Sequence, residues 1–74
     1  MNYSDGKKVQ VGDEVELWSG KFGRVVCSID DGVYTSDYSE EDWAYLKAGV
    51  MVKMDNGELM HYSMEEPGLK LIQR

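Results

Sequence analysis

The chain holds one thiol and one imidazole, Cys27 and His61, which are the side chains of a cysteine–histidine nucleophilic pair. A reactive thiolate needs an exposed, electropositive setting. Cys27 lies instead in an apolar run between Val25 and Ile29, where a free cysteine behaves as a small buried hydrophobic residue. We interpret His61 as a sheet residue rather than a general base, and one histidine cannot form a metal site alone. The sequence therefore predicts a protein that is not an enzyme and uses no metal or cofactor.

Carboxylates and aromatic rings are concentrated in residues 30–45, which contain no lysine or arginine and which we call the acidic–aromatic segment. Its acids are Asp30, Asp31, Asp37, Glu40, Glu41 and Asp42, and its aromatic residues are Tyr34, Tyr38, Trp43 and Tyr45. Tyrosine and tryptophan are enriched in binding hot spots, and clustered acids steer a basic partner. These ten residues form the candidate partner-binding site.

The same segment also has a purely structural interpretation. Its acids then belong to a solvated loop and a helix N-terminus, while Trp43 and Leu46 fill one end of the fold, because aromatic side chains give a small core much of its area. A divalent ion among the carboxylates is a further alternative, although the spacing of a calcium-binding EF-hand loop is absent. The sequence leaves these interpretations open.

The charge of the chain argues for a protein partner. Its 74 residues include 8 basic and 14 acidic side chains, which gives a net charge of −6. Nucleic-acid-binding proteins usually carry a basic stripe that releases counterions from phosphates, so a basic protein partner is expected and nucleic acid is not. A chain of this length forms one domain, residues 1–74, that buries about 60% of its unfolded surface and leaves little area for a catalytic cleft.

The setting expected for the chain is the cytoplasm. A single cysteine excludes an internal disulfide and agrees with a reducing compartment. No apolar run reaches the length of a secretory signal or a membrane span, so no membrane association is expected.

Methionines near the last hairpin, with Tyr62, offer an apolar patch for a partner or a second copy, and a monomer or weak homodimer is predicted.

Apolar residues recur at every second position between closely spaced turn residues, which is typical of a small all-β protein. Val15 and Leu17 are expected to face the core, and Val25 and Cys27 to share one face of the next strand, with Gly23 at a bulge or a close backbone approach. The predicted strands are residues 9–11, 14–18, 22–29, 33–35, 50–54, 58–63 and 69–72.

One short helix is expected at about residues 40–47. Ser39 is followed three residues later by Asp42, a variant of the capping box, and acids in the first turn suit the positive end of a helix. Gly49 is a plausible stop signal. In so short a chain, these elements predict a mainly β fold: a small, bent SH3-like barrel of about five strands, with one helical turn before the last hairpin.

The register of the last hairpin has two alternatives. A two-residue loop sets Asp55 directly opposite Glu58, which places like charges together. A three-residue loop with Gly57 in the left-handed conformation instead pairs Val52 with Met60. We favour the three-residue loop because its cross-strand pairs are more apolar.

Residues 11–26, VGDEVELWSGKFGRVV, resemble the KOW and Tudor-like group of SH3-like barrels, which open with Gly-Asp-x-Val and return through Gly-x-x-Gly-x-Val. Within this pattern Gly12 permits the entry turn and Asp13 can hydrogen-bond its own loop. Residues 43–50 also make the whole chain similar to small bacterial barrel proteins with a Trp-x-Tyr-Leu-x-x-Gly-Val stretch, a resemblance that brings no known activity.

The KOW resemblance implies RNA or protein binding through basic loops, yet the matching loop holds only Lys21 and Arg24 as basic residues. The Tudor resemblance implies an aromatic cage for methylated lysine or arginine. The aromatic residues available for such a cage are Trp18, Tyr34, Tyr38, Trp43 and Tyr45.

The hypothesis we favour is a small protein-binding module that places its acidic, aromatic face against a basic protein surface. One specific form is a bacterial immunity or inhibitor protein that masks a basic toxin site. The alternative is a KOW-like nucleic-acid or ribosome-associated module. A cleft enzyme that uses His61 and nearby acids is the weakest of the hypotheses.

Overall fold

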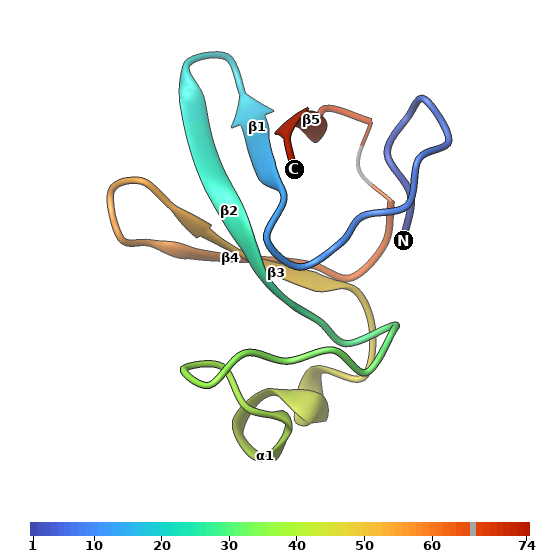
Figure 1. The fold of residues 1–74 in the computed structure, drawn as a ribbon, viewed down its shortest axis with the longest axis vertical. Coiled ribbons are helices and arrows are strands. Elements are labelled where there is room, and N and C mark those ends of the chain that lie inside the picture. The colour runs from blue at the N-terminus through green and yellow to red at the C-terminus, as the bar shows by residue number, and fades with distance from the viewer. Residues whose placement is uncertain (66) are drawn as a thin grey trace.

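One antiparallel sheet of five strands, in the order β4-β3-β2-β1-β5, organises the chain. The computed structural model describes residues 1–65 and 67–74. The strands are β1 (Glu14–Trp18), β2 (Lys21–Ser28), β3 (Val50–Met54), β4 (Leu59–Tyr62) and β5 (Lys70–Gln73). Helix α1 (Glu40–Trp43) and the 3-10 helix η1 (Ala44–Leu46) lie between β2 and β3 (Figure 1). The prediction of a mainly β fold is confirmed.

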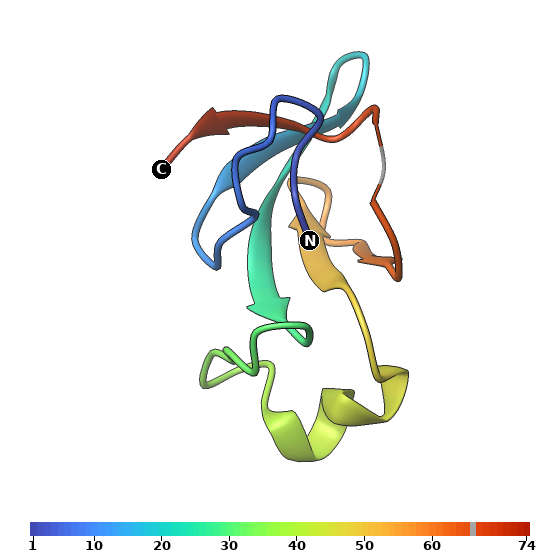
Figure 2. The same ribbon diagram turned by 90° about the vertical axis from the view of Figure 1, so that its right-hand side faces the viewer.

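The connection from β2 to β3, residues 29–49, projects from one end of the sheet, and we call it the excursion. Helix α1 lies at one end of the long axis, and the turn between β1 and β2 lies at the other (Figures 1 and 2). The principal extents of the molecule are 32 × 26 × 19 Å. A surface on α1 is therefore well separated from a surface at the β1–β2 turn.

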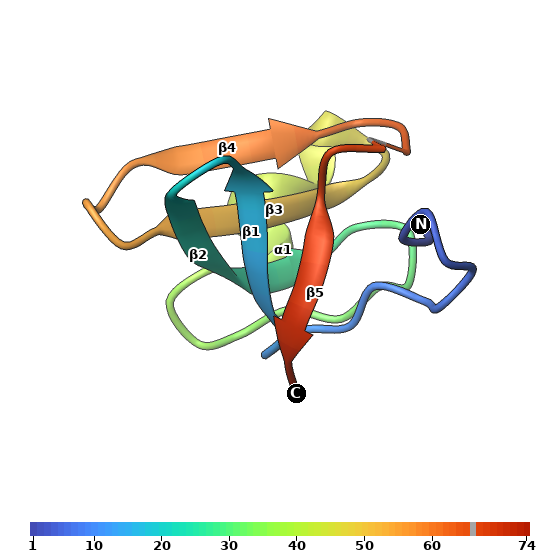
Figure 3. The same cartoon turned by 90° about the horizontal axis from the view of Figure 1, so that it is seen from above.

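The sheet is strongly bent, so that β1 and β5 cross the direction of β3 and β4 (Figure 3). The outer strands of the order, β4 and β5, have no ladder between them in the described part of the chain. The sheet therefore curls around one face without a β4–β5 ladder to close it, and the closed SH3-like barrel stays a prediction.

The concave face of the sheet holds the core. Val15 and Leu17 are buried there, as their alternation predicts. Full burial of each such side chain contributes about 1.5–3 kcal/mol. The other members of the core cluster come from four regions of the chain: Tyr3, Val9, Val25, Val50, Val52, Met54 and Leu69.

Two predicted strands are wrong. Residues 9–11 form no strand, although Val9 is fully buried, because the N-terminal residues fold back on themselves and make only an isolated bridge between Asn2 and Lys8. In the predicted return strand 33–35, Thr35 forms an isolated bridge with Tyr38 instead of β2, and the pairing with β2 is limited to a bridge between Ser28 and Val33. Beyond that bridge the chain is attached to β2 by a side chain, since the Thr35 hydroxyl donates to the Val26 carbonyl oxygen at 3.0 Å.

A β-bulge in β2 overturns the expectation that Val25 and Cys27 share a face. Val25 lies opposite Val52, whereas Cys27 lies opposite Met51, so one extra residue of β2 is inserted between them. Directly paired residues point to the same side of a sheet. Cys27 therefore shares the outer face with Met51 and is absent from the core cluster, yet both side chains are buried.

The last hairpin has the three-residue loop that we favoured. Val52 pairs with Met60 and Val50 pairs with Tyr62. Gly57 has a φ of 92°, and its amide donates to the Met54 carbonyl oxygen at 2.8 Å. The predicted register is confirmed.

The excursion returns to the sheet at Gly49, which does not itself end the helix. The left-handed residue after η1 is Lys47, with a φ of 70°. Gly49 has a φ of 92°, and a Cβ atom there would lie 1.8 Å from the Tyr62 carbonyl oxygen. Its amide donates to Asp30 Oδ1 at 2.9 Å, and its carbonyl oxygen accepts from the Ile29 amide at 2.8 Å. Glycine is therefore required where the two ends of the excursion meet.

The turn before β1 is organised around Asp13, whose side chain is only 2% exposed. Its Oδ2 accepts hydrogen bonds from the Tyr3 hydroxyl at 2.6 Å and from the Gln10 amide at 3.0 Å. Its Oδ1 lies 3.3 Å from Arg74 Nε. Burial of Tyr3 and its hydrogen bond to Asp13 raise the pKa of the phenol well above its ordinary value, so Tyr3 stays a donor. One carboxylate thus joins the N-terminal loop to the last residue of the chain.

We predict that Gly49→Ala destabilises the fold by more than about 3 kcal/mol, because the methyl group meets backbone atoms and the φ is unfavourable for alanine. Gly57→Ala is the matched control: it has the same φ and open space around it, and should cost about 1 kcal/mol. Urea unfolding of both variants measures the difference. Equal losses would contradict the close approach at Gly49.

We predict that Asp13→Asn lowers the free energy of unfolding by about 2–4 kcal/mol, because a buried carboxylate loses the charge that strengthens its hydrogen bonds and pairs with the exposed Arg74. Asp55→Asn, on the exposed hairpin loop, should stay within about 0.5 kcal/mol of the wild type. Urea unfolding at neutral pH measures both. A small effect of Asp13→Asn would show that the carboxylate is not an anchor.

Candidate functional site

The acidic–aromatic segment occupies most of the excursion, and part of it lies against the outer face of the sheet. Partial desolvation raises the pKa of the Tyr34 phenol, and the nearby Glu40 and Cys27 add smaller effects in the same direction. The neighbouring Thr35 hydroxyl donates to the Val26 carbonyl oxygen of β2 at 3.0 Å, and Cys27, the next residue of β2, is fully buried. The excursion thus buries outer-face residues of β2 while its tip extends beyond the sheet.

Helix α1 begins as the capping variant predicts. Ser39 has extended backbone angles, and its Oγ accepts a hydrogen bond from the Asp42 amide at 3.4 Å. The Ser39 hydroxyl in turn donates to Asp42 Oδ2 at 3.1 Å. Glu40, Glu41 and Asp42 fill the first turn, where the helix dipole favours negative charge. The cap fixes these carboxylates at the tip of the excursion.

Three of the predicted aromatic residues come together around Trp43. Its ring lies 6.1 Å from that of Tyr38, tilted by 41°, and 6.5 Å from that of Tyr45, stacked at 24°. These separations fall in the range that aromatic pairs prefer. Tyr45 is 68% exposed, so the group reaches the surface. We call Tyr38, Trp43 and Tyr45 the aromatic stack.

The five aromatic residues considered for a cage do not converge. Trp18 is the last residue of β1, next to the β1–β2 turn, and that turn lies at the end of the molecule opposite α1 (Figures 1 and 2). The ring contacts of Trp43 in the described part of the chain are with Tyr38 and Tyr45 and do not include Tyr34. A cage assembled from all five is therefore not formed.

Two of the six predicted acids, Asp30 and Asp31, stabilise the fold through hydrogen bonds and ion pairs. Asp30 accepts from the Gly49 amide, and its Oδ2 lies 3.4 Å from the amino group of Met1. Asp31 pairs with Lys8 Nζ at 2.9 Å and accepts from the Ser28 hydroxyl at 3.0 Å. The hydrogen bond from Lys8 is the main cause of a lowered Asp31 pKa. A lysine far away in sequence thus neutralises part of a segment that contains no basic residue.

The remaining four acids are exposed. None of the ion pairs among residues 1–65 and 67–74 includes one of them. We call these four residues the acidic tip: Asp37, Glu40, Glu41 and Asp42.

The basic residues relevant to nucleic-acid binding are partly neutralised. Arg24 and Lys53 lie directly opposite each other on β2 and β3. Arg24 also pairs with Glu14, and Lys8 pairs with Asp31. Arg24 and Lys8 are therefore already engaged in ion pairs with acids of the same chain.

Cys27 and His61 do not form a catalytic pair. Each lies opposite Met51, one on β2 and the other on β4, so the strand β3 separates them. Strands two places apart in a sheet are about 10 Å apart. His61 Nε2 is hydrogen-bonded to the Ala48 carbonyl oxygen at 2.8 Å, and burial raises the pKa of the Cys27 thiol. The arrangement provides neither a thiolate nor a base beside it.

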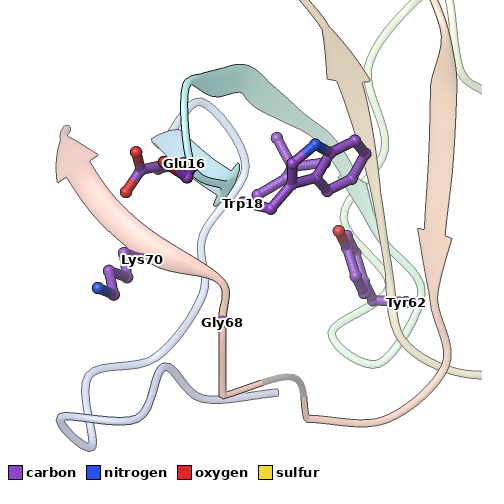
Figure 4. Close-up of a pocket in the computed structure, with 7 residues that line it drawn as sticks. Glu16, Trp18, Tyr62, Gly68 and Lys70 are labelled. Carbon is purple, nitrogen blue, oxygen red and sulfur yellow. The ribbon is translucent and has the colours of Figure 1, made fainter.

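The sequence did not reveal a groove at the open side of the sheet. It has a volume of about 550 Å³, and its walls include Leu17, Trp18, Tyr62 and Gly68 (Figure 4). Strict alternation places Trp18 on the same outward face as Glu14 and Glu16, but a bulge before the β1–β2 turn moves it to the concave side. The Ser19-Gly20 turn directly after Trp18 was the available signal of such an irregularity.

Comparisons of the chain with protein-family models, with curated proteins and with solved structures found no match.

Among the described residues, no cluster of three or more histidine, cysteine, aspartate or glutamate side chains is arranged to hold a metal ion. Helices in the same part of the chain are too short and too polar to span a membrane.

We predict that Cys27 reacts with a thiol reagent such as DTNB at least about 100-fold more slowly in the native protein than in guanidinium at pH 8, because burial blocks access and disfavours the thiolate. Absorbance of the released chromophore gives both rates. Rapid reaction of the folded protein would reveal an accessible thiolate and reopen the case for nucleophilic chemistry.

Proposed function

We propose that this protein is a non-enzymatic binding module that uses the acidic tip and the aromatic stack to bind a basic surface of another protein. The observation that carries the proposal is their adjacency, because Trp43 of the stack follows directly after the acids of α1. Anchoring rings and steering charges therefore lie on one short element.

The aromatic stack supplies contact area at a low entropic cost. Trp43 is in contact with two other rings, so part of its rotamer freedom is already lost before binding. Tyr45 is the most exposed member and would be the first ring to meet a partner. Tryptophan and tyrosine are the residue types that most often carry binding energy at interfaces.

The acidic tip supplies attraction at long range. Its four carboxylates lie outside the ion pairs of the described residues, so a basic partner does not have to displace an internal lysine or arginine. Charges of this kind raise association rates and select partners more than they add affinity. A basic surface is the matching partner for a chain with a net charge of −6.

The specific form that we propose is an immunity or inhibitor protein in the bacterial cytoplasm. Such a protein needs to cover a basic site on a toxin, and an acidic, aromatic projection from a stable sheet suits that purpose. The buried Cys27 and the hydrogen-bonded His61 agree with a module that works by binding rather than by catalysis.

We predict that neutralising the acidic tip reduces partner recovery from a lysate of the native cell about tenfold or more at low salt. The test variant combines four substitutions: Asp37→Asn, Glu40→Gln, Glu41→Gln and Asp42→Asn. Affinity capture followed by quantitative mass spectrometry measures the recovery and identifies whether the partner is basic.

A control variant removes the same number of charges elsewhere on the surface. Its substitutions are Asp5→Asn, Asp55→Asn, Glu58→Gln and Glu65→Gln. Partner recovery should be close to that of the wild type. Equal losses of partner recovery in the two variants would show that the net charge of the protein, and not the position of the acidic tip, determines binding. No loss in either variant would refute the role of the acidic tip.

A further inference from the structure

The groove at the open side of the sheet is a second surface, distant from the acidic tip. Trp18 and Tyr62 project into it from β1 and β4 (Figure 4). Tyr62 lies opposite the core residue Val50, and the bulge at Leu17 turns Trp18 to the same concave side. Both rings therefore extend the core toward the position where β4 and β5 do not pair.

The exposure of Trp18 is unusual for its place in the sheet. Val15 and Leu17 on the same strand are 0% and 3% exposed, whereas Trp18 is 46% exposed. A large ring on the concave side of a sheet is normally covered, and an exposed apolar site in a hollow commonly marks a binding site. A volume of about 550 Å³ lies within the usual range for ligand sites.

The two aromatic rings in the groove favour an apolar group between them. Among the described residues that border the groove, Glu16 and Lys70 are charged, and their side chains point away from the space between the rings (Figure 4). They lie directly opposite each other on β1 and β5, and their charges are of opposite sign. The rings of Trp18 and Tyr62 both face this space, and their apolar surfaces suit an apolar group.

The strand beside the groove favours a peptide over a free small molecule. Lys70 is the first residue of β5, which is the last strand in the sheet order. An edge strand offers backbone groups that an added extended segment can pair with. We propose that the groove receives an apolar side chain, such as leucine, from an extended segment of a partner protein that lies along the start of β5.

The test uses two capped peptides, Ac-Thr-Leu-Thr-NH2 and Ac-Thr-Lys-Thr-NH2, titrated to millimolar concentration into ¹⁵N-labelled protein. The leucine peptide should give saturable amide shifts at Leu17, Lys70 and the Trp18 indole. The lysine peptide should bind at least about tenfold more weakly, because the groove does not replace the hydration of its ammonium group.

Variants assign the binding to the groove. Trp18→Ala should weaken the leucine peptide about tenfold or more, as expected for an aromatic anchor, whereas Trp18→Phe should retain most of the affinity. Tyr45→Ala, which removes the exposed ring of the aromatic stack, should leave the affinity for the leucine peptide unchanged. Dispersed spectra confirm that each variant is folded.

Three results would overturn the proposal: absence of saturable shifts with the leucine peptide, equal affinity in Trp18→Ala, or tighter binding of the lysine peptide. Sedimentation of the protein alone at millimolar concentration can give a fourth result that would overturn it. A dimer that Trp18→Ala dissociates would mean that a second copy of this chain, rather than a partner segment, fills the groove.

Discussion

The buried carboxylate of Asp13 is the interaction on which the arrangement of this small sheet depends. It accepts from Tyr3 and from the turn amide of Gln10, and it lies beside the guanidinium of Arg74. A buried charge is tolerated only where such partners compensate for its desolvation. Because β5 ends next to Arg74, the same contact holds β5 and the N-terminal loop around β1. The ion pair between the Met1 amino group and Asp30 holds the N-terminal loop at a second point.

The excursion is fastened to this sheet at its base and left exposed at its tip. Asp30 binds the Gly49 amide, and Asp31 pairs with Lys8, so the first acids of the segment hold its ends together. The aromatic stack and the acidic tip lie beyond those contacts. This division explains how one acidic run contributes both to stability and to the surface that we propose for a partner.

Much of the fold could be predicted from periodicity and turn chemistry, including the core positions Val15 and Leu17, the capping serine Ser39 and the hairpin register. Bulges were the main source of error. Each bulge inserts one residue into a strand and reverses the faces that follow, which moved Cys27 to the outer side and Trp18 to the concave side. Contacts between residues far apart in the sequence, such as Arg74 with Asp13, produce no local sequence pattern from which they could be predicted.

The central claim is that a basic partner binds at the tip of the excursion. Amide hydrogen exchange of this protein, alone and in complex with the partner recovered by affinity capture, tests it most directly. The account predicts new protection in α1 and η1, residues 40–46, with little change in β5. Protection confined to the sheet, with none at residues 40–46, would contradict it.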